Sequence, residues 1–271
     1  MRIPIRKLTP SRVGRYLRGH WREFVRRTEY KAEIQRFLNG PSSQKALRQE
    51  LVEKFLHISS QVPCSHAESD ILRIADFILR LPRDLTGDVV ESGVFKGGAS
   101  CKLSLVAAAT GRRLILCDSF HGFPKDADKE DARLSEGEKL GTLDEVKRNV
   151  SLYGDPSVVE YVPGWLEHTL PELRATGRVL VAVFEDTDLQ DPATVCIKLL
   201  YPLLQPGGRI FTHDVMFPMA LAAYRDREVW GALDIHAPPK LVIVRKAIFR
   251  RTGALGYVTK PKAREQVRVR A

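Results

Sequence analysis

Short apolar runs that alternate with helix-like stretches constrain the fold of this chain more than any other feature. The apolar runs lie at 88–94, 113–118, 158–162, 179–185 and 208–213. Between them, apolar residues recur at helical spacing over 99–109, 142–153 and 192–204. Strands that alternate with helices in this way form a parallel sheet with helices on both faces. We therefore predict an α/β fold with a doubly wound, mostly parallel sheet.

The segments outside this alternation predict further elements and the limits of the domains. Helical patterns lie at 11–38, 44–57 and 67–81, and strand-like runs lie at 240–249 and 256–259. The stretch "NGPSS" at 39–43 separates the first two helical patterns. We predict a basic helical extension at 1–40 and one domain at 41–271, with a helical lead-in at 41–84 and a core at 85–250. The segment 125–141 is almost all charge and glycine, which predicts a mobile loop.

The positive charge is concentrated at the two ends of the chain. The net charge is +10, of which residues 1–36 carry +8 (eleven Lys/Arg, three Asp/Glu) and residues 240–271 carry +9 (ten and one). The middle, 37–239, therefore carries −7, since 8 + 9 − 7 gives +10. An anionic partner is expected at the ends rather than in the middle. The acidic middle, without a basic and aromatic groove motif, argues against a nucleic-acid partner.

Cysteine spacing and hydropathy indicate the compartment. The four cysteines lie far apart and form no paired metal-binding spacing: Cys64, Cys101, Cys117 and Cys196. No apolar run approaches the ~20 residues of a membrane span. The first ten residues also lack the apolar stretch of a secretory signal. We therefore expect a protein of the reducing cytoplasm.

The stretch "GDVVESGVFKGGAS" at 87–100 is the first candidate binding motif. The acid Glu91 ends an apolar run, and Gly93, Gly97 and Gly98 follow at once. Ligands of a parallel sheet bind outside the carboxyl ends of its strands, where glycines let the backbone approach a ligand. The spacing differs from the G-x-G-x-x-G of dinucleotide-binding proteins. An ordinary glycine-rich turn is the alternative interpretation.

Acidic residues end three further strands. Asp118 ends the second strand, where a carboxylate is placed to accept hydrogen bonds from ribose hydroxyls. Asp186 follows the fourth strand, and His213 and Asp214 follow the fifth. Because these strands are expected to be neighbours, the three side chains should lie close together. Carboxylates with an imidazole hold a divalent cation or supply a general base. Helix caps and solvated loop residues are the alternatives.

Four motifs together resemble one family. They are "GDVVESGVFKGGAS", "LILCDSFHGFP", "VPGWLEHTLPEL" and "DTDLQDPATVCIKLLYPLLQPGGRIFTHD". In this order they resemble the macrocin O-methyltransferase family of class I S-adenosylmethionine-dependent methyltransferases, whose named members methylate sugar hydroxyls of antibiotics. The resemblance covers about residues 85–230. It implies a Rossmann-like methyltransferase fold, S-adenosylmethionine as cofactor, and O-methylation of a sugar or glycosylated metabolite.

The resemblance also implies roles for individual residues. Those that would bind the methionine part, the ribose and the adenine of the cofactor are Glu91, Gly93, Gly97, Gly98, Asp118, Ser119, Phe120, Gly164 and Trp165. Asp186 and Asp214 match magnesium-binding acids, and His213 stands where the antibiotic-sugar enzymes carry a second acid. Two mechanisms follow for the catalytic pair Asp186 and His213. Either a cation held by Asp186, His213 and Asp214 lowers the pKa of the acceptor hydroxyl, or His213 acts as the base without metal.

Two other functions remain open at this point. The chain could methylate a lipid-linked glycan or another small acceptor at a membrane surface, or it could be a catalytically inactive binding protein. Residues 11–27 combine arginines with Trp21 and Phe24, a composition that predicts peripheral contact with the inner face of a membrane. Alternatively, the apolar side of that helix packs on the catalytic domain or on a second subunit. We expect a homo-oligomer with a small-molecule acceptor.

Overall fold

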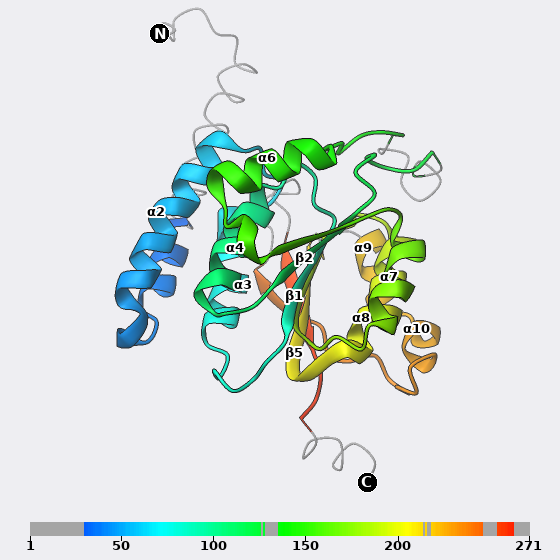
Figure 1. Ribbon diagram of the computed structural model, residues 1–271. Helices are drawn as coiled ribbons and strands as arrows, with labels where there is room; N and C mark the ends of the chain where they lie inside the picture. The colour runs from blue at the N-terminus through cyan, green and yellow to red at the C-terminus, as the bar shows by residue number, and fades with distance from the viewer. Residues whose placement is uncertain are drawn as a thin grey trace, which may run out of the picture.

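A seven-stranded sheet forms the centre of the protein (Figure 1). The computed structural model describes residues 30–125, 127, 135–213, 215, 218–245 and 254–262. The strands are β1 Asp88–Ser92, β2 Leu114–Asp118, β3 Val159–Pro163, β4 Leu180–Glu185, β5 Leu204–Thr212, β6 Val242–Arg245 and β7 Leu255–Thr259. Their order is β3-β2-β1-β4-β5-β7-β6, parallel from β3 to β5 and antiparallel at β7 and β6. The strand order reverses between β1 and β4, so the predicted doubly wound, mostly parallel sheet is confirmed.

Helices cover both faces of the sheet in two groups. One face carries α2 Lys45–Gln61, α3 Glu68–Leu79, α4 Gly98–Ala109 and α6 Leu143–Tyr153 (Figure 1, left). The other carries α7 Leu166–Ala175, α8 Gln190–Leu200, α9 Pro218–Arg225 and α10 Arg227–Gly231. Short 3-10 helices occur at η2 Ser42–Gln44, η3 Pro156–Val158 and η4 Tyr201–Leu203. The helices predicted at 44–57, 67–81, 99–109, 142–153 and 192–204 are confirmed, whereas α7, α9 and α10 were not predicted.

The helical lead-in shares its core with the sheet. Phe55 of α2 and Ile74 of α3 are buried in the same cluster as Phe184 of β4. Residues 30–38 are helical, and Phe37 is buried in this cluster too, so the described part of the basic extension packs on the domain. Arg48 is fully buried and donates to the Asp76 carboxylate (2.7 Å), which ties α2 to α3. The lead-in is therefore held rigidly over one face of the sheet.

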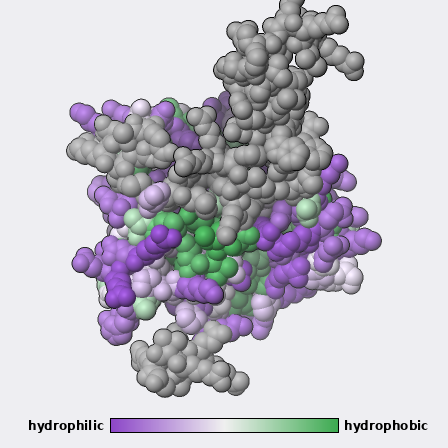
Figure 2. Space-filling view, turned by 180° about the vertical axis from the view of Figure 1, so that it is seen from behind, coloured by the Kyte–Doolittle hydropathy of each residue, from purple (hydrophilic) through white to green (hydrophobic). Residues whose placement is uncertain are grey.

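Several predictions fall on parts of the chain that the structure does not describe. Residues 11–27, the predicted membrane contact, lie outside the described residues, as do 126 and 128–134 of the predicted mobile loop. Among the described helices, none is both long and apolar enough to cross a bilayer. Figure 2 looks onto the molecule from behind and shows hydrophobic side chains at the surface, bordered by hydrophilic ones. The edge strand β6 contributes the partly exposed Ile243 to the hydrophobic surface of the molecule.

Candidate active site

A cavity opens at the carboxyl ends of β1, β2 and β4, where the strand order reverses. Its lining includes Gly93 and the polar residues Asp118, Ser119, Asp186 and Asp188. The lining also includes the apolar residues Phe123, Trp165, Leu166, Leu189 and Pro192, and Ser65 and Lys139, which are joined by a hydrogen bond of 2.7 Å. Ligands of open α/β sheets bind at this topological position. A cavity lined by both apolar and polar side chains suits a ligand that carries both a ring and hydroxyl groups.

The glycines of the first motif bring backbone segments together. A Cβ on Gly93 would lie 2.0 Å from the carbonyl oxygen of Asp186, so only glycine lets the ends of β1 and β4 approach so closely. Gly97 has φ +80° and precedes α4, and a Cβ on Gly98 would lie 2.7 Å from the carbonyl oxygen of Pro63. Of these three glycines, Gly93 lines the cavity. Close packing of the chain, besides close approach of a ligand, therefore explains why glycine occupies these positions.

Asp118 organises the turn beside it. Its carboxylate accepts hydrogen bonds from the backbone N–H groups of Val94 and Phe120, both at 2.6 Å. The second bond holds Phe120 at φ +57°, a left-handed conformation that is rare for a phenylalanine. Burial raises the pKa of Asp118, and the backbone hydrogen bonds oppose the rise. A carboxylate has about four acceptor positions, so Asp118 keeps acceptor capacity for a ligand in the cavity.

The structure brings some of the predicted cofactor residues to the cavity and places others behind it. Ser119 and Trp165 line the cavity with Asp118, and Trp165 is 37% exposed. Phe120 and Gly164 flank these residues without lining it, although the N–H of Gly164 donates to the Asp118 carbonyl (2.9 Å). Gly97 and Gly98 lie at the beginning of α4, also outside the lining. The predicted site residues whose side chains border the cavity thus come from the end of β2, from the turn after β3 and from the loop after β4.

Glu91 points away from the cavity. The strand extends one residue further than expected, to Ser92, and alternation along it directs Glu91 to the face covered by α3 and α4. The carboxyl group is 0% exposed, and neither oxygen has a hydrogen-bond partner among the described residues. Burial raises the pKa of Glu91 to about 8, while nearby Ser100 and His66 act in the opposite direction. Glu91 is therefore largely protonated at neutral pH.

The free energy of unfolding should depend on pH because of this proton on Glu91. Below pH 4.5, the ordinary pKa, the group is protonated in both the folded and the unfolded state and costs nothing. Between pH 4.5 and about 8 the unfolded chain loses the proton while the folded chain keeps it, so the free energy of unfolding falls. Each unit of difference in pKa is worth about 1.4 kcal/mol, which makes the fall a few kcal/mol.

Glu91→Gln should remove that fall. The measurement is urea unfolding at pH 5.5, 7 and 8.5, where the variant should gain free energy of unfolding relative to the parent as the pH rises. Glu172→Gln, an exposed position on α7, is the matched control and should follow the parent. Parallel pH profiles for Glu91→Gln and the parent would show that the buried carboxyl does not titrate as stated.

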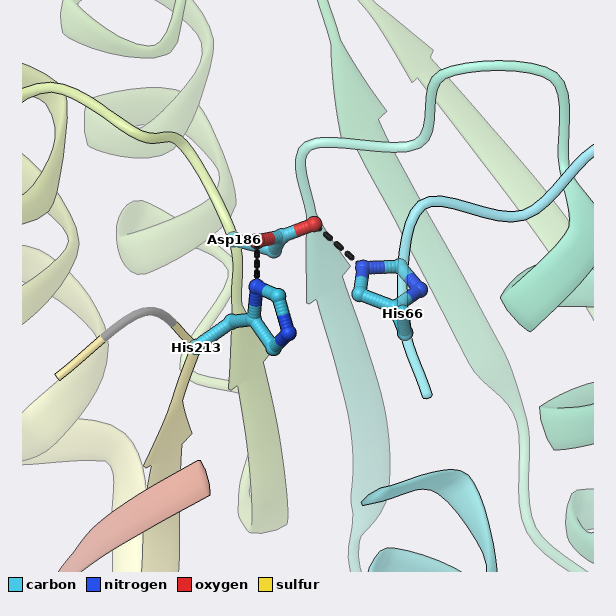
Figure 3. A group of neighbouring side chains, drawn as sticks. All are labelled: His66, Asp186 and His213. Carbon is cyan, nitrogen blue, oxygen red and sulfur yellow. Dashed lines mark hydrogen bonds and ion pairs between the residues drawn. The ribbon is translucent and has the colours of Figure 1, made fainter. Parts of the chain in front are cut away.

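Asp186, His213 and an unpredicted residue, His66, form one buried cluster. Figure 3 shows the Asp186 carboxylate between the two imidazole rings, with one oxygen toward each ring. Asp186 Oδ1 lies 3.1 Å from His213 Nδ1, and Oδ2 is hydrogen-bonded to His66 Nε2. His66 comes from the loop between α2 and α3, Asp186 follows β4 and His213 follows β5. Asp186 lines the cavity, and the two histidines lie behind it. Asp214 lies outside the described residues.

Comparison with known proteins identifies the family. The family model described as Macrocin-O-methyltransferase (TylF) matches residues 76–242, which is 167 of the 271 residues. The chain belongs to the macrocin O-methyltransferase family. Two curated relatives are an 8-demethyl-8-(2,3-dimethoxy-alpha-L-rhamnosyl)-tetracenomycin-C 4'-O-methyltransferase of Streptomyces olivaceus and a mycinamicin III 3''-O-methyltransferase of Micromonospora griseorubida. The first is 36% identical, covering 65% of this chain and 70% of the relative; the second is 34% identical, covering 52% and 61%.

Solved structures support the fold of this methyltransferase. The O-methyltransferase NovP matches with a TM-score of 0.58 and 24% identity, over 71% of this chain and 79% of that one. A calicheamicin methyltransferase matches with a TM-score of 0.57 and 23% identity, over 85% and 92%. At these identities the likeness shows the fold, which is the Rossmann-like fold predicted from the sequence. Family and relatives together make the chain an S-adenosylmethionine-dependent O-methyltransferase, as predicted.

The methyltransferase holds opposite charges in the buried cluster. Burial alone would raise the pKa of Asp186, but the two imidazoles hold it well below its ordinary value of 3.8. Burial would lower the pKa of His66, but the Asp186 carboxylate raises it to about 10. The pKa of Cys64 is lowered to about 7, because His66 and Lys102 outweigh the effect of burial. In the absence of any ligand, the cluster is therefore a carboxylate paired with protonated imidazole.

The donor set of the cluster does not fit magnesium. Magnesium takes oxygen ligands in near-ideal octahedral geometry. Two of the three donors that converge among the described residues are imidazole nitrogens, from His66 and His213. The predicted magnesium site at Asp186, His213 and Asp214 therefore gains no support from the part of the chain that the structure describes.

Glu185, next to this cluster, is the centre of a hydrogen-bond network that joins neighbouring elements of the methyltransferase. Its buried carboxylate accepts hydrogen bonds from the hydroxyl groups of Thr212 (2.7 Å), Thr187 (2.7 Å) and Tyr224 (2.9 Å). Burial raises the pKa of Glu185, and these bonds oppose the rise. The network joins β4, β5 and α9, so it fixes the two strand ends from which Asp186 and His213 extend.

Proposed function

We propose that the cavity binds S-adenosylmethionine and that the protein transfers its methyl group to a hydroxyl of a sugar or glycosylated small molecule. The observation that supports this most is that Asp118, Asp186 and Trp165 line one cavity at the carboxyl ends of the strands. Both curated relatives carry names of enzymes that methylate glycosylated natural products. The same two acids occupy strand ends where a ribose and an acceptor hydroxyl would each find a carboxylate.

Each group of lining residues suits one part of the cofactor. Trp165 and Leu166 offer an apolar surface for the adenine, and Asp118 with Ser119 offers acceptors for the ribose hydroxyls. Gly93 leaves room for the methionine part beside the end of β1. Glu91, Gly97 and Gly98 support this arrangement from behind: the glycines by allowing the turn and α4 to pack closely, and Glu91 from beneath the strand end. Phe120 and Gly164 hold Asp118 and Trp165 in place.

Methyl transfer is an in-line displacement at the sulfonium methyl group, so alignment and removal of the acceptor's proton are the protein's tasks. Asp186 lines the cavity, where its carboxylate accepts a hydrogen bond from the acceptor hydroxyl and receives its proton as the methyl group is transferred. His213 lies behind Asp186, with its Nδ1 3.1 Å from the Asp186 carboxylate. We assign Asp186 to the acceptor and His213 to the positioning of Asp186. No step in this mechanism passes through magnesium.

The sequence and the cysteine thiols support proposals about the compartment and the partners of the protein. All four cysteines are free and three are buried, which supports a reducing, cytoplasmic compartment. The acceptor is a small molecule, and no nucleic acid is expected. The homo-oligomer and the peripheral membrane contact through residues 11–27 stay predictions.

Binding of the demethylated cofactor, S-adenosylhomocysteine, tests the proposed function without a known acceptor. The parent should bind it in calorimetry, and Asp118→Asn should weaken binding by about 10- to 100-fold, because the lost acceptor is worth about 1–3 kcal/mol. Asp155→Asn is the matched control, since Asp155 also accepts from a backbone N–H two residues onward, that of Ser157. It should bind like the parent. A parent that binds no S-adenosylhomocysteine, or an Asp118→Asn variant with parental affinity, would contradict the proposal.

A further inference from the structure

We propose that His66, Asp186 and His213 bind one divalent transition-metal ion of the zinc and cobalt class. One donor atom from each of these residues lies within 4.8 Å of the other two. Two imidazoles with one carboxylate form a donor set that suits zinc, cobalt, nickel or iron(II) better than magnesium. One of these residues, His66, belongs to the helical lead-in and precedes residues 76–242, which match the family model.

The two imidazoles are aimed at the centre of the cluster by contacts on their outer sides. His66 Nδ1 lies 3.3 Å from Cys64 Sγ, and His213 Nε2 lies 3.6 Å from Asp70 Oδ2. Histidines that bind metals usually engage the second ring nitrogen with a carboxylate or another polar group, which fixes the ring orientation. Here each histidine has such an outer contact, so the inner nitrogens, His66 Nε2 and His213 Nδ1, both face Asp186.

The backbone that carries these donors is fixed. The N–H of Asp186 donates to the carbonyl of Ser92 (2.9 Å), and the N–H of His213 donates to the carbonyl of Glu185 (3.1 Å). The loop that carries His66 lies against the beginning of α4, where Gly98 leaves no room for a side chain. Preorganised ligands on rigid elements favour metal binding, because little conformational freedom is lost when the ion enters.

Burial and charge favour the ion as well. The side chains are 5%, 11% and 5% exposed for His66, Asp186 and His213, and the buried acid Asp70 lies 3.6 Å from His213. A cation at the centre would contact the carboxylate and the inner nitrogen of each ring, His66 Nε2 and His213 Nδ1. Three protein ligands leave a fourth tetrahedral position, as in catalytic zinc sites. Asp186 borders the cavity, so the ion would lie at its wall.

Metal binding is measured directly, without cofactor or acceptor, so its result is independent of the proposed methyl transfer. The full-length chain is stripped with a chelator and then titrated with Co²⁺, with the visible absorption of the ion as the signal, and with Zn²⁺ and Mg²⁺ in calorimetry. We expect one equivalent of Co²⁺ with a tetrahedral-type spectrum, displacement by Zn²⁺, and no displacement by millimolar Mg²⁺. His66→Gln should weaken binding by at least about 100-fold, because even an outer partner of a ligand is worth about 10- to 100-fold.

His168→Gln is the matched control, because His168 is an exposed histidine on α7, remote from the cluster in the chain. It should bind Co²⁺ like the parent. If His66→Gln unfolds, the parent still decides the question: Zn²⁺ should raise its melting temperature, and Mg²⁺ should not. The proposal is overturned if the parent binds no Co²⁺ or Zn²⁺, if Mg²⁺ competes equally, or if a folded His66→Gln binds as tightly as the parent.

Discussion

Gly93→Ala should lower the melting temperature by roughly 10 °C or more and abolish binding of S-adenosylhomocysteine. The new Cβ would lie 2.0 Å from the Asp186 carbonyl oxygen and 2.8 Å from its carbonyl carbon, both backbone atoms that cannot rotate away. Overpacking costs about 1–3 kcal/mol, and a strained backbone costs about 1–3 kcal/mol more. In a domain of this size, each kcal/mol lowers the melting temperature by roughly 2–4 °C.

Gly111→Ala separates the cost of overpacking from the cost of the strained backbone. Gly111 also has a positive φ, +66°, but a Cβ there would meet no atom within 4 Å. This control therefore suffers only the conformational strain, and its melting temperature should fall by a few degrees with ligand binding unchanged. Melting temperatures of the two variants, followed by circular dichroism, provide the comparison. Equal falls would show that the close approach of β1 and β4 is not what requires glycine at position 93.

Asp186→Asn should lower kcat by about 10²–10⁴-fold while the affinity for S-adenosylhomocysteine changes little. The range is that of a positioned group acting on a proton in the transition state. Asparagine keeps the shape of the side chain, but it loses the charge that pairs with His66 and His213, and its amide turns a donor toward one of the two rings. The measurement is the S-adenosylhomocysteine formed with a glycosylated small molecule that the parent methylates, alongside calorimetry of cofactor binding.

Asp191→Asn is the control for Asp186→Asn. Asp191 is an exposed acid in the first turn of α8, near Asp186 in sequence but outside the cavity lining. It should keep the parental kcat and cofactor affinity. A kcat of Asp186→Asn within a few fold of the parent would remove Asp186 from the mechanism. A parallel loss of cofactor affinity would contradict the assignment of Asp186 to the acceptor alone.

The sequence was sufficient to predict the sheet and the meeting of Asp186 with His213. Both follow from local pattern, because alternating apolar runs and helices define a parallel sheet, and neighbouring strands of such a sheet end at one edge. The orientation of the Glu91 side chain was harder to predict from the sequence. As a strand tip it was expected beside the cofactor, but the strand extends to Ser92, and the two-residue period of a strand then turns Glu91 into the core.

His66 could not be predicted from the sequence. It lies in "VPCSHA", a short connection between two helical patterns, where no periodicity indicates a direction for a side chain. Its position depends on how α2 and α3 pack on the sheet, which is a tertiary property. The available signals were weak: a histidine next to a cysteine in a loop, and a glycine at position 98 whose need becomes clear only once Pro63 and Cys64 lie against it.

The span of the cluster along the chain has a consequence for synthesis on the ribosome. His66 and Asp186 are 120 residues apart, and His213 follows a strand that is enclosed between β4 and the late strand β7. Domains emerge from the ribosome N-terminal end first, and contacts between distant residues form only after the intervening chain exists. The cluster of His66, Asp186 and His213 therefore cannot assemble until β5 has emerged. We expect a truncated product that ends before β5 to lack methyltransferase activity.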